Sequence, residues 1–180
     1  MRLPAAIVLG LLLAGCASSP TRFWTIEPAP PLAALLTAAT TAPVQIAAVH
    51  LPLALDRLEV VRHDEADRIE VLDFDRWSAP PGSLMRTALT QDLAALLPAG
   101  RVVFPEAPTP PNARRIVVDV LDLRRTADGY AMQVSWSLLP QPGRSRQLSL
   151  AAPGSDDVAG QTRAISAMIG QLASDIAASS

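Results

Sequence analysis

Proline is the residue that most constrains how this chain can fold. The sequence has 17 prolines among 180 residues, and they cluster, most densely in residues 28–31 and 105–111. Proline lacks a backbone N–H and has a fixed φ, so it interrupts the hydrogen-bond ladders of helices and strands. The sequence therefore predicts short elements separated by loops, and it predicts irregular structure for the segment 105–111, PEAPTPP.

The composition excludes several classes of function. A net charge of −2 argues against a nucleic-acid binder, which would normally carry a surplus of basic residues. All 15 basic residues are arginine, which excludes Schiff-base chemistry and the phosphate-binding lysine of a P-loop. Because the chain has one cysteine and two histidines, it cannot form an intramolecular disulfide and has no multi-cysteine zinc motif. No G-x-S-x-G motif occurs. We therefore expect no enzyme activity, no catalytic residues, no metal site and no cofactor.

The first 16 residues, MRLPAAIVLGLLLAGC, have the pattern of an export signal. Arg2 gives a short positive segment, and an apolar stretch follows from Ile7 to Ala14. This stretch is shorter than the roughly 20 apolar residues of a transmembrane helix and fits the apolar region of a signal peptide. Its end resembles the bacterial lipobox, in which a cysteine receives a diacylglycerol thioether before the signal is cleaved. The residues that carry this resemblance are Leu13, Ala14, Gly15 and Cys16.

The lipobox resemblance implies a division of the chain into three parts. These are a signal peptide at 1–15, a lipidated tether at 16–22 and a single periplasmic domain at 23–180. Several acyl chains on one cysteine hold a protein firmly at a membrane. Residue 17 is alanine and not the aspartate that retains enteric lipoproteins in the inner membrane, which favours the outer membrane. The alternative is an ordinary signal peptide that happens to contain a cysteine.

Hydrophobic patterning in the first half predicts four strands and a helix. The strands are predicted at 23–26, 43–50, 58–62 and 69–74, with the polar turn His63–Asp67 joining the last two as a hairpin. Residues 32–42 fit either a short helix or a loose connection. Apolar residues at three- and four-residue spacing predict a helix over 82–97, with Ser83 as its N-cap. This helical stripe consists of Met85, Leu89, Leu93 and Leu96.

The second half repeats the order of strands followed by a helix. Residues 102–104, 114–125, 130–139 and 147–152 are predicted strands, and 158–177 is a predicted helix that Asp156 and Asp157 precede. The apolar stripe of this helix consists of Ile165, Met168, Ile169, Leu172 and Ile176. We expect an α+β fold in which two amphipathic helices pack on a largely antiparallel sheet. The repeated order suggests two similar halves, although no repeat of individual residues supports a duplication.

From Val44 to Leu97 the order of motifs resembles the ABC-type transport auxiliary lipoprotein family. An aromatic-rich strand, Phe23 to Ile26, follows the tether. A strand then runs into L-P-x-x-L-D-R, the next strand ends in arginine, and an Arg-Trp pair precedes the helix. The residues that match these motifs are Leu51, Pro52, Leu55, Asp56, Arg57, Arg62, Arg76 and Trp77. In the second half the resemblance extends only to the order of elements.

The family resemblance implies a subunit that acts by binding other proteins. Its system would move lipids or other hydrophobic compounds between the two membranes and contribute to envelope integrity. The implied partners are an ABC ATPase, a permease and a periplasmic protein with MCE domains, with no nucleic acid, and both a monomer and a homo-oligomer stay open. The alternatives are a structural envelope lipoprotein and, less favoured, an anchored periplasmic hydrolase.

Individual residues also leave two interpretations open. Asp56 and Arg57 fit either a partner-docking pair or, preferably, a structural pair that fixes a turn. Trp77 is favoured as a core anchor over a lipid contact. Trp24 fits either the membrane interface or the core. The charged run from His63 to Asp67 is favoured as a solvated hairpin tip over a metal cluster.

Overall fold

The computed structural model describes residues 19–29, 42–64, 66–139 and 145–179. The strands in chain order are β1 (Arg22–Trp24), β2 (Val44–His50), β3 (Glu59–His63), β4 (Ile69–Trp77), β5 (Val102–Val103), β6 (Arg114–Thr126), β7 (Gly129–Leu139) and β8 (Ser145–Ala152). The helices are α2 (Pro81–Leu96), between β4 and β5, and α3 (Val158–Ala178), after β8. The predicted α+β class is confirmed. The predictions for the lipobox and, apart from residue 42, for residues 32–42 lie outside the described residues.

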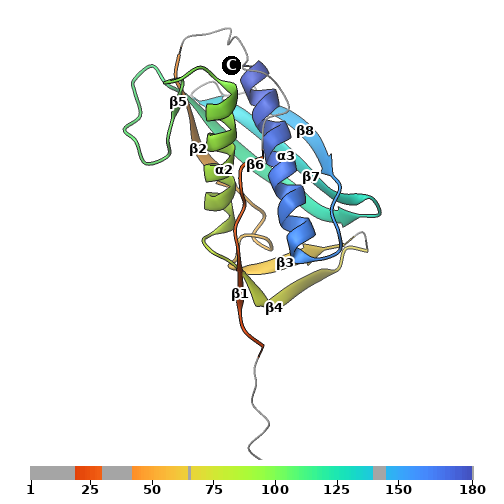
Figure 1. Cartoon of the computed structure of the whole chain (residues 1–180). Coiled ribbons are helices and arrows are strands. Elements are labelled where there is room, and N and C mark those ends of the chain that lie inside the picture. Colours follow the sequence, from red (N-terminus) through yellow and green to blue (C-terminus); the bar gives the residue numbers. More distant parts are fainter. Residues whose placement is uncertain (1–18, 30–41, 65, 140–144, 180) are drawn as a thin grey trace, which may run out of the picture.

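The strands form two sheets, of which the larger has the order β5-β2-β6-β7-β8 and the smaller β1-β4-β3. Both helices lie side by side on one face of the larger sheet (Figure 1). The smaller sheet lies at the end of the molecule where the described chain begins (Figure 1). Because the chain passes from β1 to β4 through both sheets, the two halves do not form separate units.

The expectation of a largely antiparallel sheet needs correction, because both sheets are mixed. β1 pairs with β4 in parallel, and β2 pairs in parallel with both β5 and β6. The pairs β3–β4, β6–β7 and β7–β8 are antiparallel, as expected of hairpins. Sequence patterning identifies a strand by its own periodicity but does not reveal the direction of a distant partner. That is why the parallel pairs were missed.

The core lies between the larger sheet and the two helices. Ile116, Val118 and Val120 of β6 face it, as their alternation predicts, until a register shift after Val120 brings Leu123 inward in place of Asp122. The stripe predicted for α3 is also confirmed, because all its members are at most 1% exposed. They are Ile165, Met168, Ile169, Leu172 and Ile176.

The two helices begin in different ways. Asp157 caps α3 by accepting a 2.6 Å hydrogen bond from the backbone N–H of Gly160. In contrast, α2 begins at Pro81, one residue before its predicted start, and has no side-chain cap. The expectation that Ser83 caps α2 is therefore wrong. Proline at the first helical position has no N–H that needs a partner, and Pro81 supplies this start instead.

Among the described residues, no helix is both long enough and apolar enough to cross a membrane.

Candidate functional site

The motif residues of the sequence analysis fall in two neighbouring places. The L-P-x-x-L-D-R segment forms the loop between β2 and β3, beside the start of α2. Arg57, just before β3, and Arg76, on β4 of the smaller sheet, both contact Glu59 at the start of β3.

A tight turn shapes the loop after β2. The carbonyl oxygen of Pro52 accepts hydrogen bonds from the backbone N–H groups of Leu55 (2.8 Å) and Asp56 (3.0 Å). This turn directs Leu55 into the core, where it is 8% exposed, and leaves Leu53 92% exposed. Asp56 is exposed, and its carboxylate has no hydrogen bond or ion pair with any described residue. The loop therefore presents a free carboxylate on a fixed backbone.

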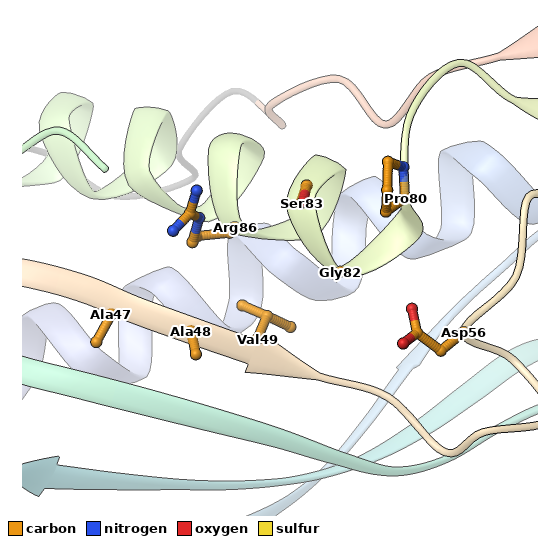
Figure 2. A pocket seen from close by; sticks show the side chains of 8 residues that line it. All are labelled: Ala47, Ala48, Val49, Asp56, Pro80, Gly82, Ser83 and Arg86. Carbon is orange, nitrogen blue, oxygen red and sulfur yellow. The ribbon is translucent and has the colours of Figure 1, made fainter. Parts of the chain in front are cut away.

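A groove of about 300 Å³, here called the β2 groove, lies between this loop, β2 and the first turns of α2. Its lining residues are Ala47, Ala48, Val49, Asp56, Pro80, Gly82, Ser83 and Arg86 (Figure 2). One wall is an open strand edge. β5 pairs only with Val44 and Gln45, so no described strand pairs with this side of β2 beyond Gln45. The groove is therefore bordered by backbone that lacks a neighbouring strand.

The β2 groove carries opposite charges from different elements. Arg86, on α2, contacts Glu106 through a 3.2 Å ion pair, but the Glu106 side chain is 92% exposed. Such an exposed pair is weak, so Arg86 can exchange this partner for another anion. Asp56 supplies the negative charge from the loop, beneath Pro80 in the close view (Figure 2). The groove thus offers the backbone hydrogen-bonding groups of β2, flanked by the cation of Arg86 and the anion of Asp56.

Buried Gln45 holds the loop that carries Glu106 against β2. Its side-chain Oε1 accepts a 2.6 Å hydrogen bond from Thr109, and its Nε2 donates at 3.4 Å to the carbonyl of Ala107. Gln45 is only 5% exposed. Sequence patterning did not select this residue, because a glutamine in an alternating strand is typical of a solvent-facing position.

Glu59 connects the two motif arginines on the smaller sheet. Its carboxylate is 3.0 Å from Arg57 Nε and 3.0 Å from Arg76 Nη2. A backbone hydrogen bond, then the hydrogen bond from Arg57, lower the pKa of Glu59. Arg57 therefore pairs with Glu59 and not with its neighbour Asp56. This fits the structural interpretation for Arg57 and separates it from Asp56, which faces the groove.

Asp75, which the sequence analysis did not select, fastens β1 to β4. It is 4% exposed and accepts hydrogen bonds from Arg22 Nη2 (2.6 Å) and Trp24 Nε1 (2.7 Å). Trp24 is half-buried and packs against the core. Its indole thus points into the domain. Of the two positions left open for Trp24, the membrane interface and the core, the structure shows the core. Asp75 holds the segment that follows the expected tether.

The three remaining motif residues are largely internal. Leu51 is partly buried and packs against the core. Trp77 is 5% exposed and belongs to the core, as favoured from the sequence. The Arg62 side chain is 22% exposed and lies 3.9 Å from Asp156 and 4.0 Å from Glu70. Its Nε is buried and makes no hydrogen bond within the described part of the chain. Arg62 therefore links the hairpin to the start of α3 through loose ion pairs.

In the charged run from His63 to Asp67, His63 ends β3, and Asp64, Ala66 and Asp67 lie between β3 and β4. Asp64 accepts hydrogen bonds from the backbone N–H groups of Ala66 and Arg68. Within the described residues, no cluster of three or more histidine, cysteine, aspartate or glutamate side chains could hold a metal ion.

The family model for the ABC-type transport auxiliary lipoprotein component matches residues 24–177. The chain belongs to this family. The match begins at Trp24 and ends near the last turn of α3, so the family domain includes both sheets and both helices. The resemblance seen in the sequence is therefore confirmed over nearly the whole described domain. This family is defined by an auxiliary role in ABC-type transport and is not a known enzyme family.

Two solved structures share the fold of this auxiliary lipoprotein. A crystal structure of an uncharacterized protein superposes with a TM-score of 0.71 at 16% identity, covering 88% of this chain and 97% of that one. A crystal structure of a protein from Xanthomonas campestris gives a TM-score of 0.64 at 13% identity, covering 86% of this chain and 92% of that one. At these identities the likeness concerns the fold alone. No match was found among curated proteins.

Proposed function

We propose that this chain is a lipid-anchored subunit that serves an ABC transport system by binding another protein of that system. The transported compounds are lipids or other hydrophobic molecules that move between the two membranes. Cys16 carries the anchor, residues 1–15 are the signal that is removed, residues 16–22 are the tether, and residues 23–180 form the binding domain. Family membership supports the transport role, and the lipobox-like sequence supports the anchor.

The β2 groove is the observation that carries the binding role. An extended segment of a partner can pair with the open edge of β2, because main-chain hydrogen bonds give affinity without requiring a particular sequence. Arg86 and Asp56 then select a segment with an acidic and a basic residue at matching positions. The alanines at 47 and 48 leave room for the partner's side chains. The groove therefore fits a protein segment better than it fits a compact small molecule.

The interior of the domain also favours binding over carriage of lipid. The space between the helices and the larger sheet is filled by side chains that are 0% exposed, among them Leu89, Leu93, Ile165 and Leu172. A chamber for acyl chains would need to displace this close-packed core. We therefore assign the transported compound to the partners and protein contact to this subunit.

The family resemblance implies specific partners. A lipid anchored in one membrane places this domain in the periplasm, where the MCE-domain protein of such a system is the most direct partner. The permease and the ATPase complete the system in the inner membrane. The alanine at position 17 favours the outer membrane for the anchor. An envelope lipoprotein with a purely structural role is the competing function.

Photo-crosslinking in cells tests the proposal. A benzophenone amino acid replaces Ser83, which lines the groove, and in a matched strain it replaces Gln91, which is also exposed on α2 but outside the groove. We expect an adduct with the MCE-domain protein from position 83 and none from 91. The Arg86→Glu variant should lose this adduct, whereas Arg163→Glu, at an exposed arginine of α3, should retain it.

Two results would overturn the assignment. Equal adducts from positions 83 and 91 would mean that the groove is not the contact surface. The absence of any transport-system protein among the adducts, with unchanged detergent and solvent sensitivity in a deletion strain, would favour the structural envelope role.

A further inference from the structure

The outer face of the smaller sheet exposes two aromatic rings beside two arginines. Phe23 of β1 is 69% exposed and lies opposite Arg76 in the register, and Phe74 of β4 is 46% exposed. Phe74 and Arg76 are two residues apart on one strand, so both project to the same side. We call Phe23, Phe74, Arg76, Arg57 and Glu59 the aromatic face. Large apolar side chains are costly to expose together, and such patches mark contact surfaces.

The position of this face in the chain identifies what covers it. Phe23 is seven residues after Cys16, and seven extended residues span at most about 25 Å. The described chain enters the domain through β1, at the end occupied by β3 and β4 (Figure 1). The hydrogen bonds from Arg22 and Trp24 to Asp75 hold β1 firmly to β4. An anchor at Cys16 therefore keeps the aromatic face, and not the opposite end, within reach of the bilayer surface.

We propose that the aromatic face rests on the surface of the membrane that holds the Cys16 anchor. The proposal rests on the lipid anchor of the proposed function and adds an orientation to it. The phenyl rings enter the boundary between headgroups and acyl chains, where burial of apolar area is favourable. Arg57 and Arg76 reach the lipid phosphates, which guanidinium groups bind through paired hydrogen bonds.

The charges of the face suit a phospholipid surface. Arg57 and Arg76 share a single carboxylate, that of Glu59. The three side chains together therefore carry one net positive charge. Asp73, exposed on the same strand, lowers the local surplus. The apolar rings, together with the short tether, must therefore provide most of the contact with the membrane. We expect this contact to depend only weakly on the fraction of anionic lipid.

The test uses a phenylalanine analogue in a tethered chain. The chain from Cys16 to Ser180 is coupled through its single thiol to a maleimide phospholipid in phosphatidylethanolamine–phosphatidylglycerol vesicles that also contain a clickable phospholipid. Benzoylphenylalanine replaces Phe23, Phe74 or Phe104 in separate preparations. Phe104 is the matched control, because it is 53% exposed but follows β5 at the end opposite the smaller sheet (Figure 1). We expect lipid adducts from positions 23 and 74 and only background from 104.

Each other outcome contradicts the proposal. Equal lipid labelling at all three positions would mean that the tethered domain has no fixed orientation. Adducts between two protein chains at 23 or 74 would assign the face to a second copy. Background labelling everywhere would place the face away from the bilayer. Because the lipid is attached chemically, these results do not depend on lipidation in cells, which palmitate labelling of Cys16 tests separately.

Discussion

The indole Nε1 of Trp24 donates a 2.7 Å hydrogen bond to Oδ1 of Asp75. These two residues are 51 positions apart in the sequence and lie on different strands, and the carboxylate is almost completely buried. Burial alone would raise the pKa of Asp75, but the hydrogen bonds from Arg22 and Trp24 outweigh it and lower the pKa. One carboxylate thus holds the first strand of the described chain against β4.

Replacement of Asp75 by alanine should therefore loosen β1. It leaves the Trp24 donor without a partner, which typically costs about 1–3 kcal/mol of unfolding free energy. Urea unfolding measures this loss, and faster tryptic cleavage after Arg22 reports the loosened strand. Asp73→Ala is the control, because Asp73 is an exposed neighbour on β4. Equal stability of the two variants would contradict the assigned role.

The pH dependence of the Asp75 contribution follows from the lowered pKa. The folded state binds this proton more weakly than the unfolded state, so the stabilisation is complete above an unfolded pKa of about 3.9. It is lost as the pH falls through the lower folded pKa. The difference in stability between the wild type and Asp75→Ala should therefore shrink below about pH 4.

Asp92 on α2 should have the opposite effect on stability. Its side chain is 2% exposed, its Oδ2 has no hydrogen bond within the described residues, and burial raises its pKa to about 6. Between the unfolded and folded pKa values the folded state binds more protons, so stability falls as the pH rises toward 6. Asp92→Asn should raise the unfolding free energy by about 1–3 kcal/mol at pH 7.

Urea unfolding at pH 5 and pH 7.5 checks the prediction for Asp92. The gain from Asp92→Asn should be smaller at pH 5, where the wild-type carboxyl is mostly protonated. A gain that is equal at both pH values would mean that the substitution acts through packing and not through the charge.

Leu89 lies at the centre of the α2 stripe and is 0% exposed. Leu89→Ala should cost about 2–5 kcal/mol, because it removes apolar contacts and leaves a cavity between α2 and the rest of the core. Thr87→Ala, at an exposed position of the same helix, should cost far less. Thermal unfolding of both variants measures the difference, and an unchanged Tm for Leu89→Ala would show that this face is not core.

Gly82 sets how closely α2 approaches β2. Glycine-to-alanine changes inside helices usually stabilise by about 1 kcal/mol, but a Cβ here would lie 2.7 Å from the backbone oxygen of Val49. Backbone cannot give way as a flexible side chain does, so Gly82→Ala should instead lower stability by about 1–3 kcal/mol. Ser83→Ala is the control at the exposed neighbour. A higher Tm for Gly82→Ala would refute the close approach.

Cys16→Ser should leave an uncleaved precursor that takes up no labelled palmitate, because a hydroxyl cannot form the thioether that precedes cleavage. Immunoblotting after metabolic labelling separates precursor from mature chain. Normal processing of this variant would identify the segment as an ordinary signal peptide.

Sequence patterning was most successful where a residue's environment is set by its own element. The alternation in β6 and β7 and the stripe of α3 were predicted correctly because each strand or helix has one buried face. Asp92 could also have been found, because it occupies a position of the α2 stripe, between Leu89 and Leu96. An acid on an apolar stripe is the signal that was overlooked.

Other features depend on partners far away in the chain. Asp75 reads as a solvated residue beside Phe74 and Arg76, and only the parallel pairing with β1 gives it two donors. The open edge of β2 likewise results from the short pairing with β5, which no local pattern shows. Of the residues that line the β2 groove, the sequence motifs named only Asp56, and the rest of the site required the fold.

The parallel pairing of β2 with β6 has a consequence for the order in which the molecule is assembled. The register joins Val44 to Arg114 and His50 to Asp119, so the larger sheet cannot close until the chain has emerged beyond residue 119. The long loop between β2 and β6 must close before the contacts between these two strands can stabilise the fold, and closing such a loop slows folding. The larger sheet can therefore form only after most of the chain has been synthesised.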